Sequence, residues 1–220
     1  MTGSASAEQS LPLRGRKKLR VRRALTDTAL RLFIEQGFHQ TTLERLVDEA
    51  EVSMRTFFRY FSSKEAVAMA AEEELWEAAV DEAGRLEIGG PALDALRRAL
   101  LAALKRLDDD WERRFVATRG LAARTPELRE YSTMATFRVQ EELAEVLEDK
   151  LGVDGRDDVR LRLVCEFAMS AWRCGAKNWV RGLRGRSRRV GRAALVHRVG
   201  DAFDAIPASL TFGALTGVSS

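Results

Sequence analysis

Apolar residues recur at every third or fourth position along most of this 220-residue chain. Near its start, Leu25, Ala29, Leu32 and Phe33 stand at i, i+4, i+7 and i+8, which places them on one face of a helix. The same period continues almost to the far end, with only 4 Pro to interrupt it. The pattern predicts an all-α protein of roughly nine helices and no strand.

The first helices are short and carry clear capping signals. Gly37 supplies the left-handed residue that ends a first helix, and Thr41 with Glu44 is typical of a capping box that begins a second. Ser53 is a good N-cap for a third helix, and Ser62–Glu65 is typical of another capping box. This second box opens a long fourth helix, expected over 63–82.

The rest of the chain is punctuated in the same way. Pro91 is suited to a first helical position, and Gly152 is suited to a helix end. The acidic triplet 108–110 is expected to cap the helix that begins at Trp111. The other later helices are expected at 91–107, 126–151, 157–181 and 187–206.

Three short helices, with only a brief turn between the second and third, are typical of a helix-turn-helix. This arrangement explains why residues 51–65 combine aromatic and basic side chains. Helical spacing turns Val52, Phe57 and Phe61 inward, so the opposite face is free to meet base edges in a DNA major groove. The residues expected to face DNA are Met54, Arg55, Thr56 and Arg59, with Tyr60 and Lys64 at the far end on phosphates.

Charge adds a second signal upstream. The run Leu13–Arg23 contains seven basic residues and no acid. Such a block either binds a polyanion or is simply a solvated helix face, and composition alone leaves both open. If it binds DNA, Arg16 and Lys17 are expected to contact phosphates or an adjacent minor groove.

The stretch that carries these features resembles the TetR family of transcriptional regulators. Residues 33–67 read FIEQGFHQTTLERLVDEAEVSMRTFFRYFSSKEAV. They follow the family pattern of Gly-Phe or Gly-Tyr, Thr-Thr, Ala-Gly-Val-Ser, an aromatic-rich third helix that ends in Phe, and Lys-Glu. Two residues depart from it: Glu51 stands where the family usually has Gly, and Phe58 stands where many members have Tyr. Glu51 is expected to strain or reshape its turn, and Phe58 to remove one phosphate hydrogen bond.

The resemblance implies a homodimer with two DNA-binding heads and a body that binds a small-molecule effector. It implies a flexible arm at 1–15, a helix-turn-helix domain at 16–65, a ligand-binding and dimerisation domain at 66–208, and a flexible tail at 209–220. In the head it adds Thr41, Thr42 and Ser53 to the expected DNA contacts. The expected partner is a palindromic double-stranded operator, bound as a repressor and released by the effector.

The body contains aromatic residues that suit either a core or an apolar ligand pocket. The candidates for the pocket are Trp76, Trp111, Phe115, Phe137, Phe167 and Trp172. The last two helices offer a face for a second copy in Leu161, Val164, Ala168, Leu195, Val199 and Phe203, unless these are buried within one subunit. The stretch LRLVCEFAMSAWRCGAKNWVRG loosely resembles members that sense acyl-CoA, and the basic residues in and after it suit an anionic effector.

Several classes of protein are not favoured. There is no apolar run of 18 residues and no apolar segment at the start, so we expect neither a membrane span nor a secretory signal. Cys165 and Cys174 fall on opposite faces of one helix, and unbridged thiols suit a cytoplasmic protein. No metal-ligand spacing, phosphate loop or nucleophile motif is present, so we expect no metal, no cofactor and no catalysis. The alternatives are an architectural DNA-binding protein without an effector, and a helical enzyme or lipid carrier.

Overall fold

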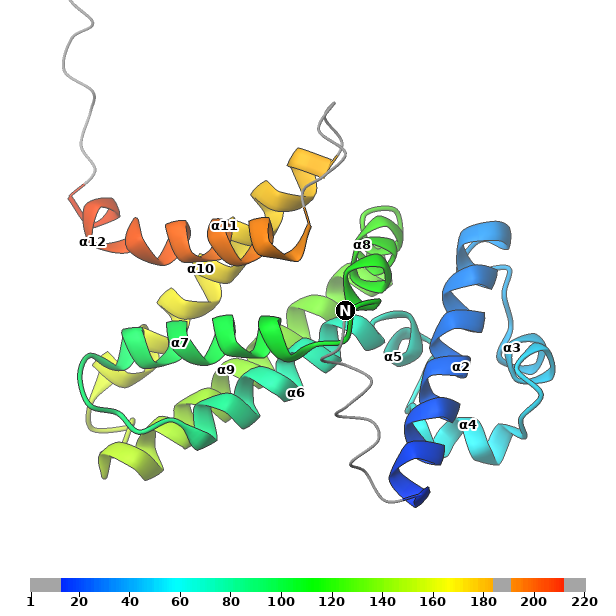
Figure 1. Cartoon of the computed structure of the whole chain (residues 1–220), viewed down its shortest axis with the longest axis horizontal. Helices are drawn as coiled ribbons and strands as arrows, with labels where there is room; N and C mark the ends of the chain where they lie inside the picture. The colour runs from blue at the N-terminus through cyan, green and yellow to red at the C-terminus, as the bar shows by residue number, and fades with distance from the viewer. Residues whose placement is uncertain (1–12, 184–190, 212–220) are drawn as a thin grey trace, which may run out of the picture. The chain divides into compact units, whose positions relative to one another are not determined.

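In the computed structural model, residues 13–183 and 191–211 are described, and within these ranges the chain forms helices and no strand (Figure 1). The predicted all-α fold is therefore confirmed. The helices are α2 Leu13–Gln36, α3 Leu43–Glu49, α4 Met54–Tyr60, α5 Lys64–Ala68, α6 Ala70–Arg85, α7 Ala92–Arg106, α8 Trp111–Ala122, α9 Pro126–Leu151, α10 Val159–Leu183, α11 Arg192–Asp204 and α12 Ile206–Ser209. The predicted flexible arm and flexible tail fall almost entirely outside the described residues.

Each short helix of the head begins at a hydroxyl cap, although two of the three caps are not the residues predicted. The Oγ of Ser53 accepts a hydrogen bond from the Thr56 N–H at 3.1 Å, as expected. At α3 the cap is Thr42, which accepts from the Arg45 N–H at 3.2 Å, and at α5 it is Ser63. The predicted caps, Thr41 and Ser62, were therefore each one residue too early.

The predicted fourth helix is broken at Met69 into α5 and α6. There the Glu72 N–H bonds to the Met69 carbonyl at 2.9 Å, so the Ala68 carbonyl needs another donor. The Thr118 hydroxyl of α8 supplies it at 3.0 Å. The break is therefore stabilised by a residue fifty positions along the chain, which no local pattern could reveal.

The acidic triplet does not cap α8 with a side chain. Asp110 precedes the helix without a side-chain capping bond, and the Asp108 carboxylate instead accepts from the Asp110 N–H at 2.9 Å. Three arginines compete for these carboxylates. Ion pairing has therefore replaced the predicted capping role.

The chain packs as two compact units. One comprises the residues up to Glu77 together with Arg106–Arg138, and the other comprises Ala78–Lys105 with the residues from Val139 onwards. The division differs from the predicted boundary at residue 65, because α8 and the start of α9 belong with the head. Whether 16–65 and 66–208 act as separate domains remains a prediction.

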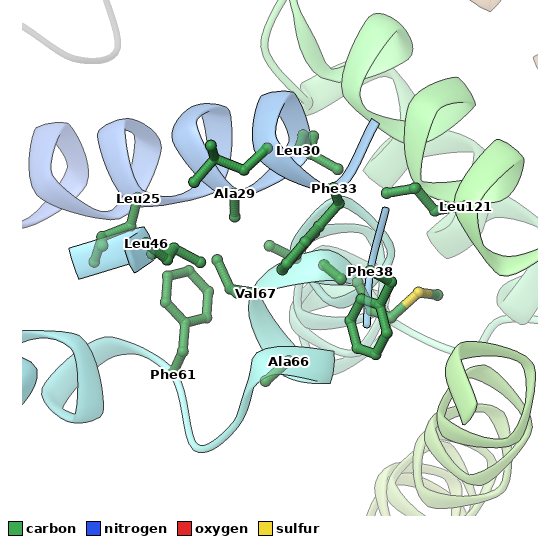
Figure 2. Close-up of a cluster of buried hydrophobic side chains, with 14 of the residues drawn as sticks. Leu25, Ala29, Leu30, Phe33, Phe38, Leu46, Phe61, Ala66, Val67 and Leu121 are labelled. Atoms are coloured by element: carbon green, nitrogen blue, oxygen red, sulfur yellow. The ribbon is translucent and has the colours of Figure 1, made fainter. Parts of the chain in front are cut away.

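An apolar cluster in the first unit, which we call the head core, fixes the short helices (Figure 2). Leu25, Ala29 and Phe33 of α2 meet Leu46 of α3, and Phe61 follows α4 in the same cluster. Leu121 of α8 also lies in this core. The head core therefore joins α8 to the helices of the predicted helix-turn-helix.

In the second unit, α10 and α11 cross at close range through Gly175. A Cβ at this position would lie 2.7 Å from the Val199 Cα and 2.8 Å from the Arg198 carbonyl oxygen, so only glycine fits without movement. The buried residues of the two helices include Leu161, Ala168, Leu195, Val199 and Phe203. These five side chains pack inside the chain itself, which corrects their assignment to a face for a second copy; Val164 is half-buried.

Candidate nucleic-acid interface

The turn between α3 and α4 is built on a strained residue. Glu51 has φ +52°, in the left-handed region that favours glycine, so of the two expected alternatives the turn is strained. The strain costs on the order of 1 kcal/mol. It is offset by a hydrogen bond from the Val52 N–H to the Val47 carbonyl at 3.0 Å. The turn keeps its shape and presents α4 at the surface.

The two faces of α4 differ sharply. Phe57 is fully buried, and Phe61 just beyond the helix is buried too. On the other side Arg55 and Arg59 are exposed, and the Arg59 guanidinium lies 5.2 Å from the centre of the Tyr60 ring. The helix therefore presents two cations to solvent, where the residues of a recognition helix contact base edges.

Other predicted contacts on or near α4 are only partly available. Met54 and Tyr60 are half-buried and pack against the head core. Thr56 is half-buried, with its hydroxyl 3.0 Å from that of Ser53. Ser53 and Thr42 are exposed while capping their helices. A hydroxyl that accepts a capping hydrogen bond can still donate its own proton, so capping does not exclude a phosphate contact.

Two predicted DNA contacts have structural roles instead. Thr41 is fully buried and donates to the Gly37 carbonyl at 3.0 Å, so it cannot reach DNA. The Lys64 ammonium donates to the carbonyls of Phe38 and Thr41 at 2.9 and 3.2 Å and lies 4.2 Å from the centre of the Phe38 ring. It ties the α2–α3 turn to α5 with two of its three N–H donors, so a structural role replaces the phosphate contact as our expectation.

The basic run lies on the first turns of α2. Lys17, Lys18 and Arg20 are exposed, and Arg16 is half-buried. Further along, Arg23 is 3.2 Å from Asp108, so it is engaged by an acid. Of the two residues expected to meet phosphates, Lys17 is therefore exposed and Arg16 only partly so.

A buried ion cluster, which the sequence did not indicate, lies in the same unit and includes Arg23 of this run. Arg114 of α8 is 2% exposed, and its guanidinium lies 2.6 Å from both Glu74 and Asp108. Burial raises the pKa of the Glu74 carboxyl above its ordinary value, although Arg114 opposes the shift. Through Arg23 the cluster connects α2 to α6 and α8. Its members lie up to 91 positions apart in sequence, too far for a local pattern to connect.

Two family models match the chain, and together they include most of it. The model described as bacterial regulatory proteins of the tetR family matches residues 25–71, and the MftR C-terminal domain matches residues 90–210. The HTH-type transcriptional regulator TcmR of Streptomyces glaucescens is 33% identical over 172 residues, which cover 76% of each chain. The chain belongs to the TetR family.

Two further similarities extend over nearly the whole of this TetR-family chain. A protein of Mycobacterium tuberculosis, named for a role as transcriptional regulator of mycofactocin biosynthesis, is 25% identical over 199 residues, covering 89% of this chain and 94% of its own. The crystal structure of a regulator assigned to the TetR family, from Mesorhizobium loti, is 21% identical and covers 87% of this chain and 97% of its own, with a TM-score of 0.49. The relatives regulate transcription and are not enzymes, so this TetR-family chain is a DNA-binding transcriptional regulator.

The six aromatics predicted to line a pocket are divided between the two units. In the first unit, Trp111 and Phe115 stack with ring centres 4.7 Å apart, and the Trp111 indole N–H donates to the Ala71 carbonyl at 2.7 Å. Trp76 is buried in this unit too, whereas Phe137 is 53% exposed. In the second unit Trp172 is buried and Phe167 half-buried. A ligand pocket lined by these residues stays a prediction.

The described residues contain neither a membrane-spanning helix nor a cluster of metal-ligating side chains. None of their helices is long and apolar enough to span a bilayer. Within the same ranges, no group of three His, Cys, Asp or Glu side chains is placed to hold a metal ion. The basic residues Arg173, Lys177 and Arg181 are exposed on α10, and Arg184, Arg186, Arg188 and Arg189 lie outside the described residues.

Proposed function

We propose that this TetR-family regulator is a repressor that binds a palindromic operator as a homodimer and is released by a small amphipathic effector. The observation that carries the proposal is the outer face of α4, where Arg55 and Arg59 are exposed above the buried Phe57. An arginine in the major groove pairs with guanine through two hydrogen bonds, each pair discriminating by about 1–3 kcal/mol. Two such arginines give too little specificity for one genomic site.

A second copy would supply the missing specificity. Two heads held one helical turn apart, about 34–36 Å, read a palindrome with twice the number of base contacts. Because five of the six predicted interface residues are buried within the chain, the face for this copy needs other residues. Val159 and Leu163 of α10 are 64% and 45% exposed and stand four residues apart on one face. They supply an apolar stripe on which two copies of α10 could pair.

The effector would act by shifting a population of conformations. A ligand that binds better to a form with wrongly spaced heads lowers the affinity for the operator, and the operator lowers the affinity for the ligand by the same factor. Helix α6 begins in the first unit and ends in the second, so we place the transmission along it. The exposed cations of α10 suit a ligand with a phosphate and an apolar chain, such as an acyl-CoA.

The proposal is tested in two steps. Selection from a random DNA library should return a palindrome, bound by two chains for each duplex when measured by light scattering. Leu163→Glu should give a monomer that no longer prefers a palindromic sequence. Arg162→Glu changes an exposed neighbour on α10 and should remain a dimer. Acyl-CoA chains of increasing length are then titrated against the operator complex. Selection without a consensus would contradict the proposal and favour an architectural DNA-binding protein without an effector.

A further inference from the structure

The outer face of α4 carries one large apolar side chain among its cations. Phe58 is 53% exposed, in contrast to Phe57 and Phe61, which are buried. It follows Arg55 by three residues and precedes Arg59 by one, so all three project from the same side of the helix. An exposed aromatic is unfavourable in water, and nothing in the head core requires one at this position.

The ring of Phe58 is also held in place. It meets the Phe57 ring edge to face, with the two ring centres 5.4 Å apart and the planes at 86°. Phe57 is itself fixed in the core. An apolar surface that is both exposed and oriented suits a contact that needs shape, because little side-chain freedom remains to be lost on binding.

Only one group on a base edge in the major groove is apolar. Thymine presents its C5-methyl there, whereas the other bases present hydrogen-bond donors and acceptors that a phenyl ring cannot match. We propose that Phe58 reads a thymine in each half-site by packing on its C5-methyl, between the bases that Arg55 and Arg59 contact. This assignment rests on the proposed function, because it requires α4 to enter the major groove.

Deoxyuridine gives a direct test, because it lacks only the methyl group. Each thymine of the selected operator is replaced in turn by uracil, symmetrically in both half-sites, and the affinity of the unmodified protein is measured. At one position we expect binding about 15-fold weaker, since each lost methyl contact accounts for about fourfold. In Phe58→Ala the same replacement should have no effect. Ile34→Ala removes an equally exposed residue of α2, 53% accessible, and should keep the full uracil effect.

The outcomes separate this inference from the proposed function. If an operator is bound tightly but thymine and uracil bind equally at every position, Phe58 does not read a methyl group and only this inference fails. A uracil effect that persists in Phe58→Ala would also overturn it, because another residue would then read the methyl. Failure to select any operator would overturn the proposed function itself. The scan with unmodified protein requires no substitution, so a folding defect cannot obscure it.

Discussion

Replacing Gly175 by alanine should destabilise the second unit, although alanine is the better helix former. The added Cβ would lie 2.7 Å from the Val199 Cα, 2.8 Å from the Arg198 carbonyl oxygen and 2.9 Å from the Val199 nitrogen. All three atoms are backbone, so no side chain can rotate away, and α11 must move by several tenths of an ångström. The contacts on both sides of the crossing weaken when the helices separate.

The magnitude follows from two opposing effects. Over-packing of a closely packed site costs up to about 3 kcal/mol, and a clash with backbone lies at the high end of this range. The gain in helix propensity from Gly to Ala returns roughly 1 kcal/mol. We therefore expect the free energy of unfolding to fall by about 2 kcal/mol.

Urea unfolding followed by circular dichroism measures this loss. Gly120→Ala in α8 is the matched control, because nothing lies within 4 Å of the added Cβ. Its effect should have the opposite sign, a gain of up to about 1 kcal/mol. If Gly175→Ala were as stable as the unmodified protein, α10 and α11 would not cross as closely as described.

Three further predictions concern single side chains. Burial raises the pKa of the Cys165 thiol to about 12, so at pH 8 a thiol reagent should label only the exposed Cys174 quickly. A Cys174→Ser variant should therefore react with the reagent only when it is unfolded. Lys64→Met removes the donor from two carbonyls and should lower the free energy of unfolding by about 2 kcal/mol. The salt dependence of DNA binding should stay unchanged, and a shallower salt slope would show that Lys64 contacts a phosphate. Arg114→Met leaves two partly buried carboxylates without their main cation and should lower the free energy of unfolding by about 3 kcal/mol, measured by heat or urea. An unchanged stability would refute the stabilising role of the ion cluster.

The sequence was a good guide where local periodicity decides the outcome. Phe57 is buried and Arg55 exposed because a helix of known period must place them on opposite sides. The left-handed conformation of Glu51 was one of the two alternatives expected from its position in a turn that usually requires glycine. These features depend on neighbours within a few residues.

Features that depend on distant partners could not be predicted. Two adjacent threonines are equal candidates for a cap, and only the burial of Thr41 decides in favour of Thr42. The acceptors of Lys64 lie 23 and 26 residues before it, so its pattern fits a phosphate contact equally well. Apolar spacing on α11 showed that Val199 would be buried, but it could not show whether its own chain or a second copy would cover it.

The claim that the outer face of α4 reads DNA is tested most directly by a specificity ratio. Affinities for the selected operator and for a scrambled duplex are compared at the same salt concentration, about 150 mM, because phosphate contacts then contribute about equally to both and cancel in the ratio. We predict a ratio of about 1,000 or more for the unmodified protein, reduced by about 10-fold or more in Arg55→Ala. Lys17→Ala should weaken binding to both duplexes and leave the ratio unchanged. Equal affinity of the unmodified protein for the two duplexes would contradict sequence-specific reading by α4.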